Sequence, residues 1–118
     1  MTDLPKAEAD PNIYTTAINI LCQLFNAEVE DIEAAINALP FDQALAFDEA
    51  LRTESVQSAS IFISAEVIMN KLAREHFIPI NTVYDILIPQ LGRGTELDKA
   101  MNYGNYDYVN ALVTNALG

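Results

Sequence analysis

The chain has 118 residues, of which 51% are hydrophobic and 19% are charged, proportions that fit one globular domain and exclude disorder as a description of the whole chain. Seventeen acidic residues against six basic ones give a net charge of −11 at pH 7, so the surface repels phosphate backbones and anionic membranes and attracts basic partners. Composition alone therefore disfavours direct binding of nucleic acid.

The negative charge is concentrated in the N-terminal half of the sequence. Residues 1–54 contain eleven acidic and two basic residues, whereas residues 55–118 contain six acidic and four basic residues. One end of the fold is therefore expected to carry most of the negative potential.

The sequence also bears on the compartment. The single cysteine, Cys22, cannot form an internal disulfide, and the first ten residues lack the basic start and apolar run of a signal peptide. No stretch reaches the roughly 20 apolar residues that span a bilayer. These features predict a cytoplasmic protein that does not insert into a membrane.

Residues 1–10 are predicted to form a flexible acidic leader, and residues 11–118 a single helical domain. Asp10 followed by Pro11 suits a helix start, because aspartate caps helices and proline is favoured at the first helical position. Apolar residues then recur at three-to-four spacing and predict a helix over about 11–26.

The second helix is predicted to begin in a cluster of four acidic residues, a residue type that suits the positive end of a helix dipole. The cluster consists of Glu28, Glu30, Asp31 and Glu33. Pro40 is expected to end this helix, because proline cannot donate the hydrogen bond that would continue it.

The third helix is predicted to be capped by Asp42 and to run to about Arg52. Its spacing points Phe47 toward the core and Asp48 and Glu49 toward solvent. Three short antiparallel helices are therefore expected in the N-terminal half.

A longer fourth helix is predicted from a cap at Ser55 to about residue 77. It is apolar nearly all round between Ile61 and Met69, which is normally a mark of a central helix. A short strand over 60–64 is the competing interpretation, because Ile-Phe-Ile is β-prone, but the surrounding residue types favour helix. Three basic residues near its C-terminal end complement the helix dipole: Lys71, Arg74 and His76.

Three shorter helices are predicted to follow, and a loop from Pro89 to Gly94 separates the first of them from the second. Their predicted caps are Asn81 for a helix over 82–88, Thr95 with Asp98 for a helix ending at Gly104, and Asn105 for a helix ending at residue 117. The sequence thus predicts an all-α fold, a compact bundle of about six or seven short helices around a central apolar helix at about 55–77.

Few residues could carry catalysis. Cys22 has apolar helical neighbours, which predict an inert core thiol rather than a nucleophile. His76 is the single histidine, so no zinc-binding histidine pair can form, and a surface position at a helix end is the favoured interpretation. We therefore expect a protein that is not an enzyme and needs no cofactor or metal.

Two features have both a binding and a structural interpretation. The acidic cluster at 28–33 could hold a divalent cation, but it lacks the aspartate- and glycine-containing calcium loop, so a solvated helix start is favoured. The loop Gly92-Arg93-Gly94 could hold an anion through its backbone N–H groups. It matches no phosphate-binding motif, however, and a plain connector is favoured.

Residues 71–88 resemble a helix-turn-helix motif in the spacing of Ala73, Val83 and Ile86. The resemblance implies DNA binding, but Phe77 stands where the motif usually has glycine. The second helix also contains Asp85 and no lysine or arginine to anchor phosphate. Packing of the two helices is therefore favoured over DNA recognition.

The C-terminal tyrosines Tyr103, Tyr106 and Tyr108 are expected to form an aromatic patch. Tyrosine offers a large contact area with a polar tip, which suits a protein interface. Partly buried tyrosines of the core are an equally compatible interpretation.

The preferred hypothesis is a small acidic protein-interaction domain: an inhibitor, an immunity-type protein or an adaptor whose acidic N-terminal half docks on a basic protein, such as one that binds nucleic acid. Its predicted contact residues are Glu28, Glu30, Asp31, Glu33, Asp42, Asp48, Glu49, Tyr103, Tyr106 and Tyr108. The alternatives are a regulatory DNA-binding protein that uses residues 71–88, and a structural component that assembles as a homo-oligomer.

Overall fold

The computed structural model describes residues 11–118 of the chain. The predicted acidic leader and the predicted cap at Asp10 lie outside the described residues. Helix accounts for 82% of the described residues, and none of them lies in a strand. The all-α prediction is confirmed, and the strand considered for residues 60–64 is wrong because that segment lies inside a helix.

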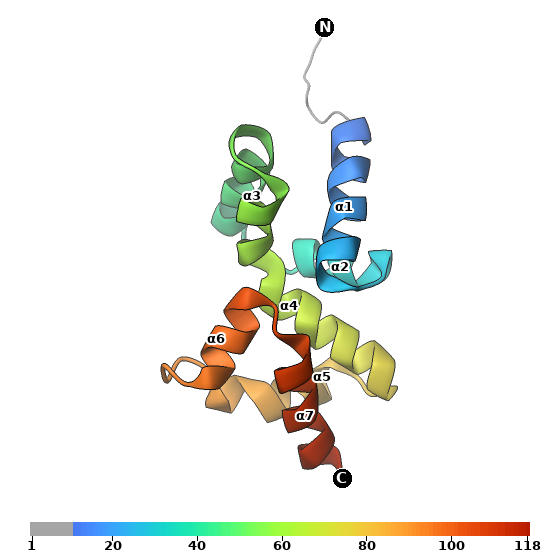
Figure 1. Cartoon of the computed structure of the whole chain (residues 1–118), viewed down its shortest axis with the longest axis vertical. Coiled ribbons are helices and arrows are strands. Elements are labelled where there is room, and N and C mark those ends of the chain that lie inside the picture. Colours follow the sequence, from blue (N-terminus) through green and yellow to red (C-terminus); the bar gives the residue numbers. More distant parts are fainter. Residues whose placement is uncertain (1–10) are drawn as a thin grey trace, which may run out of the picture.

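Seven α-helices and one short 3-10 helix follow one another in the described part of the chain (Figure 1). They are α1 (Pro11–Phe25), α2 (Val29–Asn37), α3 (Phe41–Thr53), α4 (Val56–His76), α5 (Ile80–Leu87), η2 (Ile88–Gln90), α6 (Glu96–Tyr103) and α7 (Tyr106–Leu117). The number of helices and the central place of the long α4 agree with the prediction.

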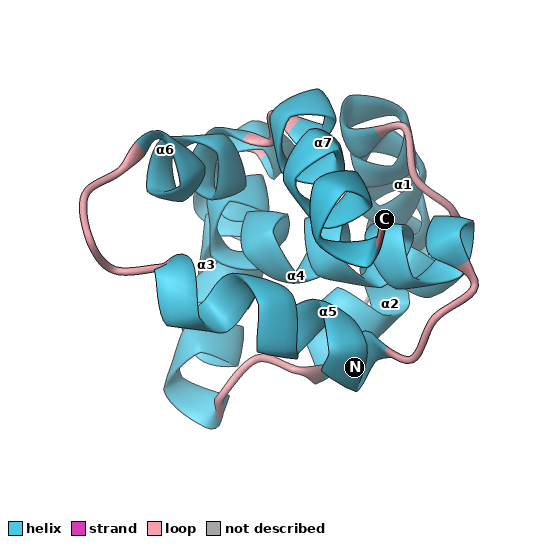
Figure 2. Cartoon of the chain, turned by 90° about the horizontal axis from the view of Figure 1, so that it is seen from below, coloured by secondary structure: helices cyan, strands magenta, loops and turns pink. Residues whose placement is uncertain are grey.

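The helix α4 joins two apolar clusters. Helices α1–α3 stand at one end of the molecule and α5–α7 at the other, with α4 between them (Figure 1). Figure 2 views the molecule from the end formed by α5–α7. The N-terminal cluster consists of Leu21, Ile32, Ala35, Phe47, Ala50, Ala59, Ile63 and Val67. The C-terminal cluster consists of Ile68, Met69, Leu72, Val83, Leu87, Leu97, Ala100, Met101, Val109 and Val113. Each large side chain buried in this way stabilises the fold by about 1.5–3 kcal/mol. Because α4 contributes residues to both clusters, both depend on this helix.

Several predicted helix ends are confirmed. The Ser55 hydroxyl accepts the N–H of Ser58 at 3.0 Å and begins α4. Thr95 and Asp98 form the predicted capping box of α6, and Gly104 ends that helix at φ +76°, a conformation that favours glycine.

Two predicted caps are wrong. The helix α3 is preceded by Pro40 rather than Asp42, and α5 by Pro79 rather than Asn81. Both prolines have extended backbones and no side-chain acceptor, but the Pro40 carbonyl accepts the N–H of Ala44 at 2.8 Å and so closes the first turn of α3. The prediction searched for a polar side chain, whereas the backbone of proline suffices.

The helix α4 is central, but it is not covered all round. Ile61 is 60% exposed and Phe62 is also exposed, whereas Lys71, predicted to complement the dipole at the end of α4, is buried in the preceding turn. The helices on either side cover different stretches of α4 and leave Ile61 uncovered between them. No helix in the described range has both the length and the apolar character needed to cross a membrane.

Candidate functional site

The outer side of α3 combines exposed apolar and acidic residues. Phe41 and Leu45 are one helical turn apart and are 79% and 55% exposed. Asp42, Asp48 and Glu49 lie on the same side, since residues three, four and seven positions apart share a helix face. We name these five residues the α3 outer face. Phe47 points the other way into the N-terminal cluster, as predicted.

The α3 outer face has a surplus of negative charge. Arg52, the single basic residue of α3, donates a hydrogen bond to Asp48 at 2.9 Å. Asp42 accepts the N–H of Gln43, and Glu49 has no side-chain partner among the described residues. A hollow of about 370 Å³ lies at Leu45 and Glu49. This face therefore presents apolar side chains and unneutralised carboxylates together.

The acidic cluster at the start of α2 is divided by the fold. Glu28, Glu30 and Glu33 are exposed, but Asp31 is only 3% exposed. Its carboxylate accepts hydrogen bonds from Nε and Nη2 of Arg74 at 3.1 and 2.9 Å, and from the N–H of Glu28 at 3.1 Å. The Asp31 carboxylate is therefore used inside the protein to join α2 to α4, and it is not part of the exposed acidic surface.

The surroundings of Asp31 affect two other groups. Hydrogen bonding to Asp31 raises the pKa of Arg74, which keeps its guanidinium charged. Burial, followed by the nearby carboxylates of Glu28 and Asp31, raises the pKa of Cys22. A raised pKa lowers the thiolate fraction of Cys22, which is partly buried against the N-terminal cluster. No three acidic, cysteine or histidine side chains of the described residues are placed to hold a metal ion together.

The three predicted tyrosines do not form one patch. Tyr103 is exposed at the end of α6, and Tyr106 is half-buried with its hydroxyl donating to Glu75. Tyr108 borders a hollow near Arg93. Burial and the hydrogen bond to Glu75 raise the pKa of Tyr106. Tyr103 is thus the most accessible of the three.

The anion-binding geometry considered for residues 92–94 is present, but the anion belongs to the chain. The Asp98 carboxylate accepts the N–H groups of Gly92, Arg93 and Thr95 at 2.7, 3.0 and 3.1 Å. These hydrogen bonds, that of Gly92 first, lower the pKa of Asp98. The loop is therefore a connector with its own internal anion.

The predicted helix-turn-helix order is also present, as α4, a turn and α5. Phe77 ends α4 at φ +56°, the left-handed conformation that a glycine would adopt more easily. Val83 is buried and Ile86 is partly buried against the C-terminal cluster, so the pair packs as the spacing predicted. The exposed residues Asn81 and Asp85 of α5 offer no positive charge for phosphate.

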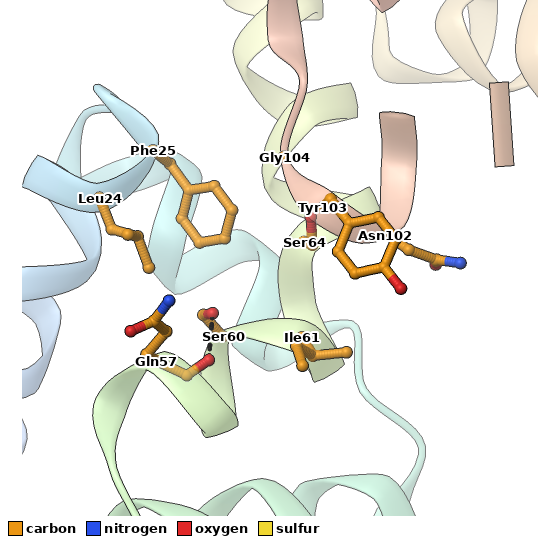
Figure 3. A pocket seen from close by; sticks show the side chains of 9 residues that line it. All are labelled: Leu24, Phe25, Gln57, Ser60, Ile61, Ser64, Asn102, Tyr103 and Gly104. Atoms are coloured by element: carbon orange, nitrogen blue, oxygen red, sulfur yellow. Dashed lines mark hydrogen bonds between the residues drawn. The ribbon is translucent and has the colours of Figure 1, made fainter. Parts of the chain in front are cut away.

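A further hollow, which was not predicted, forms where α1, α4 and α6 meet (Figure 3). Leu24, Ile61 and Tyr103 border it from three different helices. A signal that could have found it is the apolar stretch 61–69 of α4, interrupted by Ser64 and Glu66, because short neighbouring helices could not cover all of it.

Comparisons with known proteins leave the family open. No family model matches the chain, and neither a curated protein nor a solved structure is significantly similar to it. The function is therefore inferred from the residues and their geometry alone.

Proposed function

We propose that the chain is a non-enzymatic protein-interaction domain that docks the α3 outer face on a basic surface of another protein. The observation that carries this proposal is the coincidence of exposed Phe41 and Leu45 with Asp42 and Glu49 on one short helix. Apolar anchors supply most of the affinity of an interface, and a surrounding charged rim supplies orientation and partner choice.

Charge supports the choice of a basic partner. The protein carries net −11, and eleven of its seventeen acidic residues lie in the first 54 positions. A surface with such an excess accelerates encounter with basic proteins and slows encounter with acidic ones. Binding of this kind would block or recruit the partner, as an inhibitor, an immunity-type protein or an adaptor does.

The test is a pull-down with the tagged full chain from a lysate of the native host, washed at low and at high salt, with bound proteins identified by mass spectrometry. We expect a basic protein that is retained at low salt and released at high salt. The variant Leu45→Ser should lose that protein, whereas Ile88→Ser, which alters a residue of similar exposure on η2, should retain it. Capture of no basic protein, or capture that resists molar salt, would contradict the proposal.

A further inference from the structure

A second binding surface lies at the junction of the two ends of the molecule. Figure 3 shows Leu24 and Phe25 of α1 on one side of a hollow and Tyr103 of α6 on the other, with Ile61 of α4 also on its rim. Its volume is about 280 Å³, just below the roughly 300–1,000 Å³ of sites for drug-sized ligands. This size suits one large side chain rather than a complete small molecule.

The two serine hydroxyls that line this hollow are satisfied inside the protein. The Ser60 hydroxyl donates to the carbonyl of Gln57 at 2.6 Å, and the buried Ser64 hydroxyl donates to the carbonyl of Met101. An apolar group that enters the hollow therefore leaves no hydroxyl proton without an acceptor. Leu24, Ile61 and Tyr103 are exposed on the rim. Burial of such apolar and aromatic surface by a ligand is favourable.

A polar hollow of about 470 Å³ adjoins the apolar one, and both are bordered by Leu24, Phe25 and Gly104. We name the two together the junction groove. Gly104, which borders both hollows, has a left-handed backbone at φ +76°, a conformation that favours glycine. A ligand could therefore occupy both hollows within a few residues of its own chain.

The polar hollow contains two exposed carboxylates, those of Glu75 and Asp107. Asp107 has no side-chain partner among the described residues. Glu75 accepts the hydroxyl of Tyr106 and has only a distant counter-charge, since Nη2 of Arg74 lies 4.0 Å away. Both carboxylates retain acceptor capacity for a cation.

Lys71 also lines the polar hollow, but its side chain is buried, with 4% of the residue exposed. Its ammonium group donates to the Phe25 carbonyl at 3.4 Å and stands 3.9 Å from the centre of the Tyr106 ring. The C-terminal carbonyl end of α1 and an aromatic face therefore compensate Lys71 internally. The exposed carboxylates remain available to a ligand from outside.

We infer that the junction groove binds a peptide segment of another protein in which a large apolar side chain is followed closely by lysine or arginine. The apolar side chain fills the hollow beside Ile61, and the cation meets Asp107 and Glu75. This inference goes beyond the proposed function, because it assigns a second site that shares no residue with the α3 outer face.

The test is selection of a random twelve-residue peptide library, displayed on phage, against the full-length protein. We expect enriched peptides in which an apolar residue is followed within three positions by a basic one. A synthetic copy of the most enriched peptide is then titrated by fluorescence anisotropy. Ile61→Ser should weaken its binding by about tenfold or more, whereas Ile88→Ser should not, although Ile61 and Ile88 are 60% and 53% exposed.

A pair of variants that each remove one carboxylate completes the test. Asp107→Asn should weaken binding several-fold at low salt and much less at high salt, while the matched change Asp85→Asn on α5 should have no effect. Absence of the enriched pattern, or equal binding to the Ile61→Ser variant, would overturn the inference. A peptide that loses affinity with Leu45→Ser instead would overturn it too, while leaving the proposed function supported.

Discussion

The two ends of the molecule use their carboxylates differently. In the C-terminal half, Asp98 holds the loop before α6, Glu66 accepts the hydroxyl of Tyr84 at 2.9 Å, and Glu75 accepts that of Tyr106. In the N-terminal half, Asp31 is bonded to Arg74, but Glu33 and Glu49 have no side-chain partner among the described residues.

The difference matters more than the count of charges. A carboxylate with an internal donor is held in place and contributes to stability, whereas one without a donor remains free to meet a partner. We therefore expect substitution of the internally bonded carboxylates of Asp31, Asp98 and Glu66 to change stability first. Substitution of exposed acids without an internal donor, such as Glu49 and Asp107, should change binding first.

The largest expected effect concerns whether the two ends fold together. Phe47→Ala should destabilise the N-terminal cluster by about 3–5 kcal/mol, and Leu87→Ala the C-terminal cluster by about 2–5 kcal/mol. Because both clusters include residues of α4, each variant should unfold the protein in one urea transition. Coincidence of circular dichroism with tyrosine fluorescence checks this, since four of the five tyrosines follow α4 in the sequence.

Exposed Ile88→Ala serves as the control for both core variants and should change stability by less than about 0.5 kcal/mol. A Phe47→Ala protein whose tyrosine signal unfolds later than its helical signal would mean that the two ends are separable.

The next effect concerns the ion pair between Arg74 and Asp31, which joins α4 to α2. Arg74→Ala leaves the buried Asp31 carboxylate without its guanidinium donors, and should cost about 1–3 kcal/mol, a range reduced because the Arg74 side chain is 38% exposed. Arg52→Ala removes the exposed pair with Asp48 and should cost less than about 0.5 kcal/mol. If the two variants lowered the melting temperature equally, the burial of Asp31 would not strengthen the contribution of its ion pair to stability.

A smaller effect, of opposite sign, is expected at the turn between α4 and α5. Phe77 is 94% exposed and holds a left-handed backbone, so Phe77→Gly should raise the free energy of unfolding by about 0.5–1 kcal/mol. Asn26 has a similar φ of +51°, but asparagine tolerates this conformation. Asn26→Gly should therefore gain less, and the order of the two melting temperatures tests the strain at Phe77.

The smallest effect is a dependence of stability on pH. The lowered pKa of Asp98 means that its ionised form is favoured by folding. Its contribution is therefore present above the ordinary aspartate pKa of about 3.9 and is lost as the pH falls through the lower folded value. Stability measured in urea from neutral to acidic pH should fall less steeply for Asp98→Asn than for the wild type. The exposed Asp85→Asn variant should keep the wild-type dependence of stability on pH. The same dependence in all three proteins would contradict a stabilising role for the hydrogen bonds of the Asp98 carboxylate.

Periodicity and caps predicted the fold well, since the helical spacing of α1 and the hydroxyl of Ser55 act locally in the sequence. Long-range partners were beyond such reasoning. Asp31 and Lys71 look like ordinary surface charges in the sequence, and only the approach of α4 to the ends of α1 and α2 makes them internal. The exposure of Ile61 likewise depends on how far the short neighbouring helices extend, which no local pattern specifies.

The most direct test of the central proposal compares two double variants that remove the same charge from the two ends. Asp42→Asn with Glu49→Gln changes the α3 outer face, and Glu96→Gln with Asp85→Asn changes a first-turn acid and a mid-helix acid in the C-terminal half. In quantitative pull-downs at low salt, the first variant should lose most of the basic partner and the second should retain it. Equal retention, or equal loss through net charge alone, would contradict docking by the α3 outer face.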